Sequence, residues 1–236
     1  MSESVIAGTL YIVSTPIGNL EDITFRAVSI LSGVDLVAAE DTRKTKFLLN
    51  HYNLQKPLVS FFSFNEARRT PDLIAKLRSG TSIALVTDAG TPGISDPAFR
   101  IVRAALDESV PVVAIPGPSA FLAALIVSGL PVERFVFEGF LPVKKGRKTM
   151  LERLGSEERT IILYESPHRL LKTLRELHEH VGNREIAVAR ELTKKFEEVV
   201  RGRISDAIDH FSNHKVLGEF VIVLGGSSGD HPDSSG

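Results

Sequence analysis

The sequence contains no cysteine among its 236 residues. This absence excludes a disulfide framework, a zinc site built on thiolates and a cysteine nucleophile, because each of them needs the sulfur atom. A chain without cysteine is also suited to a reducing cytosol. A catalytic or binding site must therefore be built from other side chains and from main-chain groups.

The sequence also lacks a surplus of charge of either sign. Its 28 lysine and arginine residues stand against 29 aspartate and glutamate residues, which leaves a formal charge of -1. The chain as a whole therefore has no field that attracts a polyanion. A site for nucleic acid would have to come from basic residues that gather locally.

Long apolar runs are absent as well. No stretch reaches the ~18 apolar residues that a membrane-spanning helix needs, and residues 1–13 lack the basic segment that begins a secretory signal. We therefore expect a soluble, cytoplasmic protein. The length allows one large domain or two of roughly 110 to 120 residues, either of which can bury a core.

One stretch, residues 82–97, has the pattern of a ligand-binding connection. It reads SIALVTDAGTPGISDP, a buried strand that stops at a loop rich in turn-forming residues, and a helical pattern follows from Pro97. This order places main-chain N–H groups and one acid, Asp88, at the carboxyl end of a sheet, where open α/β folds bind ligands. A tight connection whose glycines serve only the turn is the alternative.

The first half of the chain alternates between strand and helix patterns. The expected strands cover residues 9–14, 35–39, 82–87 and 111–115, and the loops after them contain Pro16, Glu40, Asp88 and Gly117. This alternation predicts a parallel sheet with helices on its faces. The four loops would then gather at one edge and face the second half, so we expect a site in a cleft between two domains.

Residues 116–118 are Pro-Gly-Pro, and the regular alternation of strand and helix patterns changes there. We expect an N-terminal α/β domain with a parallel sheet over residues 1–117. A C-terminal α/β domain with a mixed sheet should cover residues 118–225. The polar residues 226–236 have nothing to bury and should be disordered.

Seven segments, in this order, resemble the tetrapyrrole methylase superfamily of S-adenosylmethionine-dependent methyltransferases. They are LYIVSTPIGNLEDIT (10–24), AEDTR (39–43), ALVTDAGTPGISDP (84–97), VAIPGPS (113–119), LYESPHR (163–169), ARELTKK (189–195) and GEFV (218–221). Together they cover most of the chain between residues 8 and 224. Within the superfamily, the sequences of these segments resemble those of the branch that methylates the ribose 2′-hydroxyl of a cytidine in bacterial 16S ribosomal RNA.

The resemblance implies two α/β domains with S-adenosylmethionine in the cleft between them, a homodimer, and ribosomal RNA in the small subunit as the substrate. It also implies cofactor contacts from loops of both halves. Those of the first half are Pro16, Ile17, Gly18, Asp88, Gly90, Thr91 and Ser119. Those further along the chain are Ala120, Leu163, Tyr164, Ala189, Gly218 and Glu219.

The first loop departs from the pattern of the wider superfamily. That pattern has a glycine-proline-glycine-aspartate run, whereas this chain has Pro16, Ile17, Gly18 and Asn19. The missing acid disfavours a tetrapyrrole substrate and fits the ribosomal branch. A methylase of a small, precorrin-type tetrapyrrole is nevertheless an alternative, and a non-catalytic nucleotide-binding module is a third reading.

Methyl transfer from a sulfonium needs neither a metal nor a covalent nucleophile, so the protein must mainly position the reactants. A ribose hydroxyl is a poor nucleophile at neutral pH, and a side chain should take or share its proton. The candidate catalytic residues are Asp41, Arg43, Glu165, Glu191 and Lys194. For each charged candidate, a solvated surface position or a structural ion pair is the alternative.

RNA binding requires basic partners for the phosphates. The candidates are Arg43, Lys44, Lys46, Lys144, Lys145, Arg147, Lys148, Lys194 and Lys195. Residues 144–148 are the densest basic segment, and we expect them to form a flexible flap beside the expected cleft.

Overall fold

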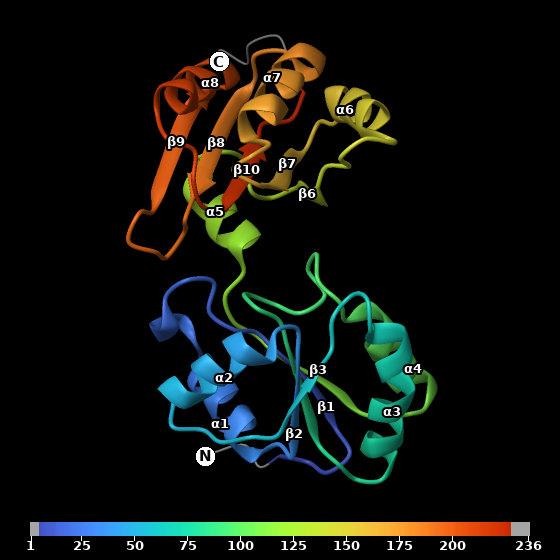
Figure 1. Ribbon diagram of the computed structural model, residues 1–236. Helices are drawn as coiled ribbons and strands as arrows, with labels where there is room; N and C mark the ends of the chain where they lie inside the picture. Colours follow the sequence, from blue (N-terminus) through green and yellow to red (C-terminus); the bar gives the residue numbers. More distant parts are fainter. Residues whose placement is uncertain (1–4, 228–236) are drawn as a thin grey trace, which may run out of the picture. The chain divides into compact units, whose positions relative to one another are not determined.

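The computed structural model describes residues 5–227. Contacts divide the chain into two compact units, and the division falls between Ser119 and Ala120 (Figure 1). We call the residues up to Ser119 unit 1 and those from Ala120 unit 2. Each unit has its own five-stranded sheet, which confirms the predicted α/β fold class. Of the tail expected over residues 226–236, only residues 226 and 227 are among the described residues.

Unit 1 contains a parallel sheet with the strand order β3-β2-β4-β1-β5. The strands are β1 (Leu10–Val13), β2 (Leu36–Ala39), β3 (Leu58–Ser60), β4 (Ile83–Val86) and β5 (Val112–Ile115). Strands β1, β2 and β4 are short apolar runs because both faces of the sheet are covered. All five strands point the same way, so their carboxyl ends share one edge.

Helices pack on both faces of this sheet. They are the 3₁₀ helix η1 (Leu20–Asp22) and the α-helices α1 (Phe25–Gly33), α2 (Thr42–His51), α3 (Glu66–Arg78) and α4 (Phe99–Asp107). Tyr11 packs in one core with Ile30 of α1, whereas Leu10 packs in the other core with Leu73 of α3. Neighbouring strand residues point to opposite faces, and each core therefore takes alternate side chains.

Unit 2 contains a mixed sheet with the order β6-β7-β10-β8-β9. The strands are β6 (Phe135–Phe140), β7 (Thr160–Glu165), β8 (Glu185–Arg190), β9 (Glu198–Arg203) and β10 (Phe220–Leu224). Strands β6 and β7 are parallel, while β10 runs antiparallel to both β7 and β8. The carboxyl ends of β6, β7 and β8 therefore lie at the same edge, where β10 begins.

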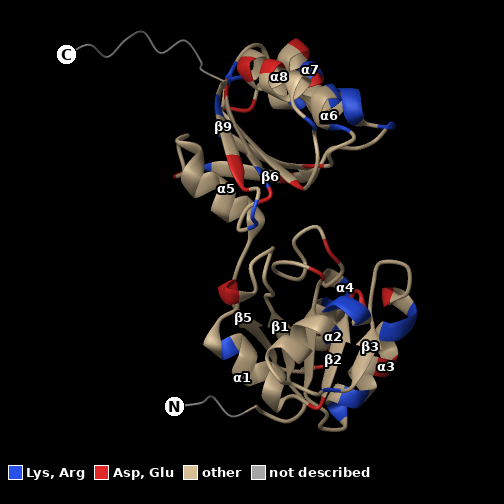
Figure 2. Ribbon diagram, turned by 60° about the vertical axis from the view of Figure 1, so that its left-hand side comes forward, with Lys and Arg blue, Asp and Glu red and all other residues tan. Residues whose placement is uncertain are grey.

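Four helices accompany this sheet: α5 (Ala120–Ser128), α6 (Arg147–Gly155), α7 (Leu170–Val181) and α8 (Ile204–Asn213). One core joins the sheet to α6, α7 and α8, through residues such as Leu151, Leu174 and Phe211. Helix α5 packs against β8 and β10 from the other face (Figure 2). Across residues 5–227, no helix is long and apolar enough to cross a membrane.

Candidate functional site

Three strand-end loops of unit 1 are held together by hydrogen bonds. Thr15, after β1, and Gly90, after β4, exchange two backbone bonds, with N···O distances of 2.9 and 3.0 Å. The hydroxyls of Ser14 and Thr91 lie 2.8 Å apart, and the Thr91 hydroxyl donates to the carbonyl of Pro118, after β5, at 3.2 Å. The edge where open α/β folds bind ligands is therefore a connected surface.

The loop after β5 approaches β1 so closely that it has room only for glycine. A Cβ atom at Gly117 would lie 2.8 Å from the Cβ atom of Ser14. Two residues later, the Ser119 hydroxyl is buried and has no hydrogen-bond partner among the described residues. Since a buried, unpaired hydroxyl is costly, this oxygen is suited to a ligand. The structure thus brings together the loops that contain Pro16 to Gly18, Asp88 to Thr91, and Ser119.

Asp88 connects the end of β4 to the end of β2. Its Oδ1 accepts a hydrogen bond from the backbone N–H of Asp41 at 3.0 Å, and its Oδ2 accepts one from Lys44 Nζ at 2.7 Å. The backbone N–H of Asp88 donates to Glu40 Oε2 at 3.2 Å. Because a carboxylate has about four lone-pair sites, Asp88 retains capacity for a ligand donor.

Asp41 and Arg43, two of the expected catalytic residues, are paired with each other. Asp41 caps α2 by accepting from the backbone N–H of Arg43 at 2.8 Å, and Arg43 Nη2 lies 2.7 Å from Asp41 Oδ2. Hydrogen bonds from the Arg43 side chain and backbone hold the pKa of Asp41 well below its usual range. Asp41 is therefore a carboxylate at neutral pH, and it is a weak base.

A cavity of about 560 Å³ opens beside these two pairs. Its lining comes from the loops after β1, β2 and β4 and from helix α2, and it includes both apolar and charged side chains. The lining residues are Thr15, Pro16, Leu20, Asp41, Arg43, Lys44, Phe47, Leu48 and Asp88. The volume lies within the range of about 300–1,000 Å³ that is typical of small-ligand pockets.

Asp96 is a titratable group of the same loop that the sequence pattern does not single out. Burial, together with the negative charges of Glu40 and Asp88, raises the pKa of Asp96 to about 7. A carboxyl group with a pKa near neutrality can both take and release a proton under working conditions. Its place within the loop that follows Asp88 is the sequence signal that could have identified it.

In unit 2, three expected site residues form one ionic cluster at the edge where β8 ends and β10 begins. Lys194 Nζ lies 2.9 Å from both Glu191 Oε1 and Glu219 Oε2, and the backbone N–H of Glu219 donates to Glu191 Oε1 at 3.0 Å. Partial burial lowers the pKa of Lys194, but its bonds to both glutamates outweigh this and raise the pKa overall. Lys194 is therefore an ammonium donor and not a free base.

Glu191 responds to the same contacts in the opposite direction. Burial raises its pKa, but the hydrogen bonds from Lys194 and from the Glu219 backbone lower it further than burial raises it. The net pKa of Glu191 is lowered, and its side chain is ionised at neutral pH. Gly218 stands beside it with a φ of +97°, and a Cβ atom there would lie 2.5 Å from Glu191 Cγ. Only glycine permits this approach.

Two other expected contacts of unit 2 occupy the strands on either side of β10. Tyr164 of β7 and Ala189 of β8 both pair with Val221 of β10, so they flank it at the same level of the sheet. The ring of Tyr164 lies 5.0 Å from that of Phe137, measured between centroids. Leu163 is fully buried and packs in the core with α7, which leaves only its main chain for a ligand.

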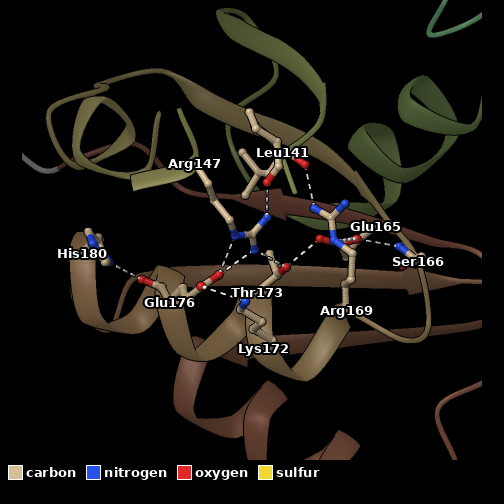
Figure 3. Close-up of polar contacts among 10 residues, drawn as sticks. Leu141, Arg147, Glu165, Ser166, Arg169, Lys172, Thr173, Glu176 and His180 are labelled. Atoms are coloured by element: carbon tan, nitrogen blue, oxygen red, sulfur yellow. Dashed lines mark hydrogen bonds and ion pairs between the residues drawn. The ribbon is translucent and has the colours of Figure 1, made fainter. Parts of the chain in front are cut away.

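The structure contradicts the expectation that Glu165 takes a proton from a substrate. Its side chain has no exposed surface, and Arg169 Nε lies 3.2 Å from it. Oε1 accepts from the Ser166 backbone at 2.8 Å, and Oε2 accepts from Thr173 Oγ1 at 2.6 Å (Figure 3). Glu165 is instead a structural residue that joins the end of β7 to α7.

Arg147 also differs from the expectation of a flexible, exposed basic segment. Only 7% of its side chain is exposed, because it is the first residue of α6 and points toward α7 (Figure 3). It donates to Glu176 Oε2 at 2.6 Å, to Thr173 Oγ1 at 2.7 Å and to the Pro142 carbonyl at 3.0 Å. We therefore remove Arg147 from the candidate phosphate contacts.

The lysines around Arg147 remain available to a partner. Lys144, Lys145 and Lys148 are exposed. Arg169 Nη2 donates to the Leu141 carbonyl at 2.6 Å, next to the Pro142 carbonyl that Arg147 holds. Two arginines thus fix the start of the loop that presents Lys144 and Lys145. Across residues 5–227, no three histidine, aspartate or glutamate side chains are grouped so that they could hold a metal ion.

The family model described as Tetrapyrrole (Corrin/Porphyrin) Methylases matches residues 9–208. A Thermotoga maritima protein named ribosomal RNA small subunit methyltransferase I is 50% identical over 219 residues, which are 93% of this chain and 99% of the relative. A Synechocystis protein of the same name is 52% identical over 223 residues, 94% of this chain and 80% of the relative.

A solved structure with the same fold is uroporphyrin-III C-methyl transferase from Thermus thermophilus complexed with S-adenyl homocysteine. Its TM-score is 0.63 and its identity 19%, over 92% of this chain and 97% of that one. At this identity, the likeness establishes the fold alone.

We expect Arg147→Met to lower the free energy of unfolding by about 3 kcal/mol, because Glu176 and the Pro142 carbonyl would lose a buried charged partner. Arg153→Met is the matched control, since Arg153 lies on the same helix and pairs with Glu138 while its side chain is 65% exposed. We expect the control to cost less than about 1 kcal/mol. Urea unfolding of both variants checks this, and equal losses would contradict a structural role for Arg147.

We expect Asp96 to make the protein less stable as the pH rises. The folded protein keeps this proton up to about pH 7, whereas the unfolded chain loses it near pH 4. The folded state therefore binds more protons in this interval, so the free energy of unfolding falls between about pH 4 and 7 and levels off above it. In Asp96→Asn this fall should shrink, whereas the exposed control Asp72→Asn should retain it. Melting temperatures at pH 5 and pH 8 measure both.

Proposed function

Because the chain belongs to the tetrapyrrole (corrin/porphyrin) methylase family, we propose that it is an S-adenosylmethionine-dependent methyltransferase that methylates the ribose 2′-hydroxyl of a cytidine in 16S ribosomal RNA. The observation that carries this proposal is its identity of 50% to a relative named ribosomal RNA small subunit methyltransferase I, over nearly the whole length of both chains. Methyl transfer follows from the family, and the RNA substrate follows from the names of these relatives.

The strand-end loops of unit 1 are suited to S-adenosylmethionine, which supplies, when bound, a methyl group activated by its sulfonium. The unpaired Ser119 hydroxyl gives a hydrogen-bonding group for such a ligand. Asp88 can accept from a ligand hydroxyl or amine. We assign the cofactor contacts of unit 1 to Pro16, Ile17, Gly18, Asp88, Gly90, Thr91 and Ser119. Those of unit 2 are Ala120, Tyr164, Ala189, Gly218, Glu219 and the main chain of Leu163.

The ribose hydroxyl needs a group that takes its proton as the methyl group arrives. Asp41 and Glu191 are our candidates, because both are ionised at neutral pH and can accept a hydrogen bond from the hydroxyl, although their lowered pKa values make them weak bases. Arg43 and Lys194 remain positively charged and are assigned to binding the sugar–phosphate chain. These roles divide the expected catalytic residues into acceptors and donors, and Glu165 belongs to neither group.

We assign the RNA phosphates to Arg43 and Lys44 in unit 1 and to Lys144, Lys145 and Lys148 in unit 2. All five side chains are exposed. We further propose that the RNA is recognised in the small ribosomal subunit and that the protein acts in the cytoplasm as a homodimer. Residues 1–117 and 118–225 would act as its two domains.

A small tetrapyrrole is the second candidate substrate, because the family description names corrins and porphyrins. The first loop argues against it, since Asn19 replaces the acid of the wider superfamily pattern. The identity to relatives named for ribosomal RNA also exceeds the 19% identity to the uroporphyrin enzyme. We therefore rank the RNA substrate first.

Incubation with methyl-labelled S-adenosylmethionine tests the proposal. We expect label in the 16S RNA of small subunits that lack the modification, and a 2′-O-methylcytidine after complete nuclease digestion. No label should enter uroporphyrinogen or a precorrin. Label in a tetrapyrrole alone would replace the RNA proposal, and cofactor binding without label in either acceptor would favour a non-catalytic module.

We expect Lys144→Ala/Lys145→Ala to weaken RNA binding and to flatten its dependence on salt. Removal of two phosphate contacts should reduce the slope of log K against log salt by about 1.4–1.8. Lys76→Ala/Lys215→Ala removes the same charge from exposed positions elsewhere and should leave the slope unchanged. Filter binding between 50 and 200 mM salt measures both variants. Over this range, the lost slope corresponds to a difference in RNA affinity on the order of tenfold. Equal slopes for the two variants would exclude this loop.

A further inference from the structure

Phe47 is an aromatic residue on the wall of the 560 Å³ cavity of unit 1, and its side chain faces solvent. It lies on α2, and 67% of its surface is exposed. Pro16, Leu20 and Leu48 line the cavity with it. Exposed aromatic surface stabilises nothing in the folded chain itself, because burial of apolar area is what contributes free energy. A ligand with a flat apolar face would cover it.

The same cavity has a charged rim. Arg43 lies one helical turn before Phe47 on α2, and residues four apart on a helix are neighbours. Lys44 stands beside Arg43, and both side chains are exposed. Their carboxylate partners, Asp41 and Asp88, also line the cavity, so each cation is already held in place. The cavity therefore combines one flat apolar surface with fixed cations.

This combination matches the chemistry of a nucleotide. Single-stranded RNA is recognised by bases that stack on aromatic side chains while basic residues hold the phosphates. Apolar ligands without charge would leave the cations unused, and a phosphate alone would leave Phe47 exposed. A volume of about 560 Å³ accommodates one nucleoside.

The cavity adjoins the loops assigned to the cofactor without coinciding with them. It shares Pro16 and Asp88 with that set, whereas Gly90, Thr91 and Ser119 are not among its lining residues. In methyl transfer, the acceptor oxygen must reach the methyl carbon from the side opposite the sulfur, so the acceptor has to lie next to the donor. The shared residues Pro16 and Asp88 make the cavity a neighbour of the loops assigned to the donor.

We propose that this cavity receives the target pyrimidine after it leaves the RNA stack, with its base stacked on Phe47 and its phosphate held by Arg43 and Lys44. The inference rests on the proposed function, because it assumes an RNA acceptor. An enzyme that modifies one nucleotide within folded RNA must expose that nucleotide, and a stacking surface offsets the lost base stacking.

The chain contains a matched control for Phe47. Phe25 begins α1, also in unit 1, and is 99% exposed, but it does not line the cavity. Both residues can be truncated without opening a core. A loss confined to position 47 would thus reflect the cavity and not the removal of an exposed ring.

The first test is methylation of small subunits by the full chain. We expect Phe47→Ala to raise KM about 5- to 140-fold, as the loss of one base–aromatic stack predicts. Phe47→Leu, which keeps apolar bulk without a ring, should be similarly impaired. Phe47→Trp, which keeps an aromatic ring, should retain activity. Phe25→Ala should match the wild type. A Phe47→Ala variant with unchanged kinetics would overturn the proposal.

The second test does not depend on methylation. Cytidine 5′-monophosphate, titrated into the wild-type protein, should show upfield ring-current shifts of its H5 and H6 resonances, and Phe47→Leu should abolish them. These shifts without any RNA methylation would support the cavity and reject the proposed function. Methylation without these shifts would reject the cavity. If Phe47→Ala instead changed the oligomeric state by light scattering, Phe47 would belong to an interface between copies, which also overturns the proposal.

Discussion

The reciprocal backbone hydrogen bonds between Thr15 and Gly90 are the contact on which the unit 1 site depends. Parallel strands bring their carboxyl ends to one edge, but they leave the loops beyond that edge free to diverge. This pair removes that freedom for the loops after β1 and β4. The Thr91 hydroxyl then extends the connection to the loop after β5, and Asp88 extends it to the loop after β2. Each loop thereby has a fixed position relative to its neighbours.

In unit 2, buried side chains fix the position of a loop. Glu165, at the end of β7, and Arg147, at the start of α6, meet at the hydroxyl of Thr173, which donates to the first and accepts from the second. Both ions are buried, so each would be costly without the other contacts of this network. The network fixes the backbone at Leu141 and Pro142, and therefore the root of the loop that carries Lys144 and Lys145. Rigid presentation lowers the entropy lost on binding.

Much of the fold could be predicted because its strands are short apolar runs that end at proline, glycine or acid. Strand β9 (Glu198–Arg203) could not be predicted, since it lies at the sheet edge and reads EVVRGR, without an apolar run. The position of Arg147 could not be predicted for a second reason. Its neighbours in sequence are lysines, which predict a solvated segment, while its partners Thr173 and Glu176 are more than 25 residues away. Sequence proximity cannot report contacts of that kind.

The sequence by itself determined the alternation of strands and helices, the edge at which the loops gather, and the residue types that stand there, because these depend on local patterns and on strand direction. Only the tertiary structure decided which charged side chains are paired or buried. Asp41 is matched by Arg43 and Lys194 by two glutamates, Glu165 is buried, and Asp96 is placed near two other acids, so its pKa is raised. The physical reason is that the ionisation and reach of a side chain depend on its desolvation and on nearby charges, and both are set by residues distant in sequence.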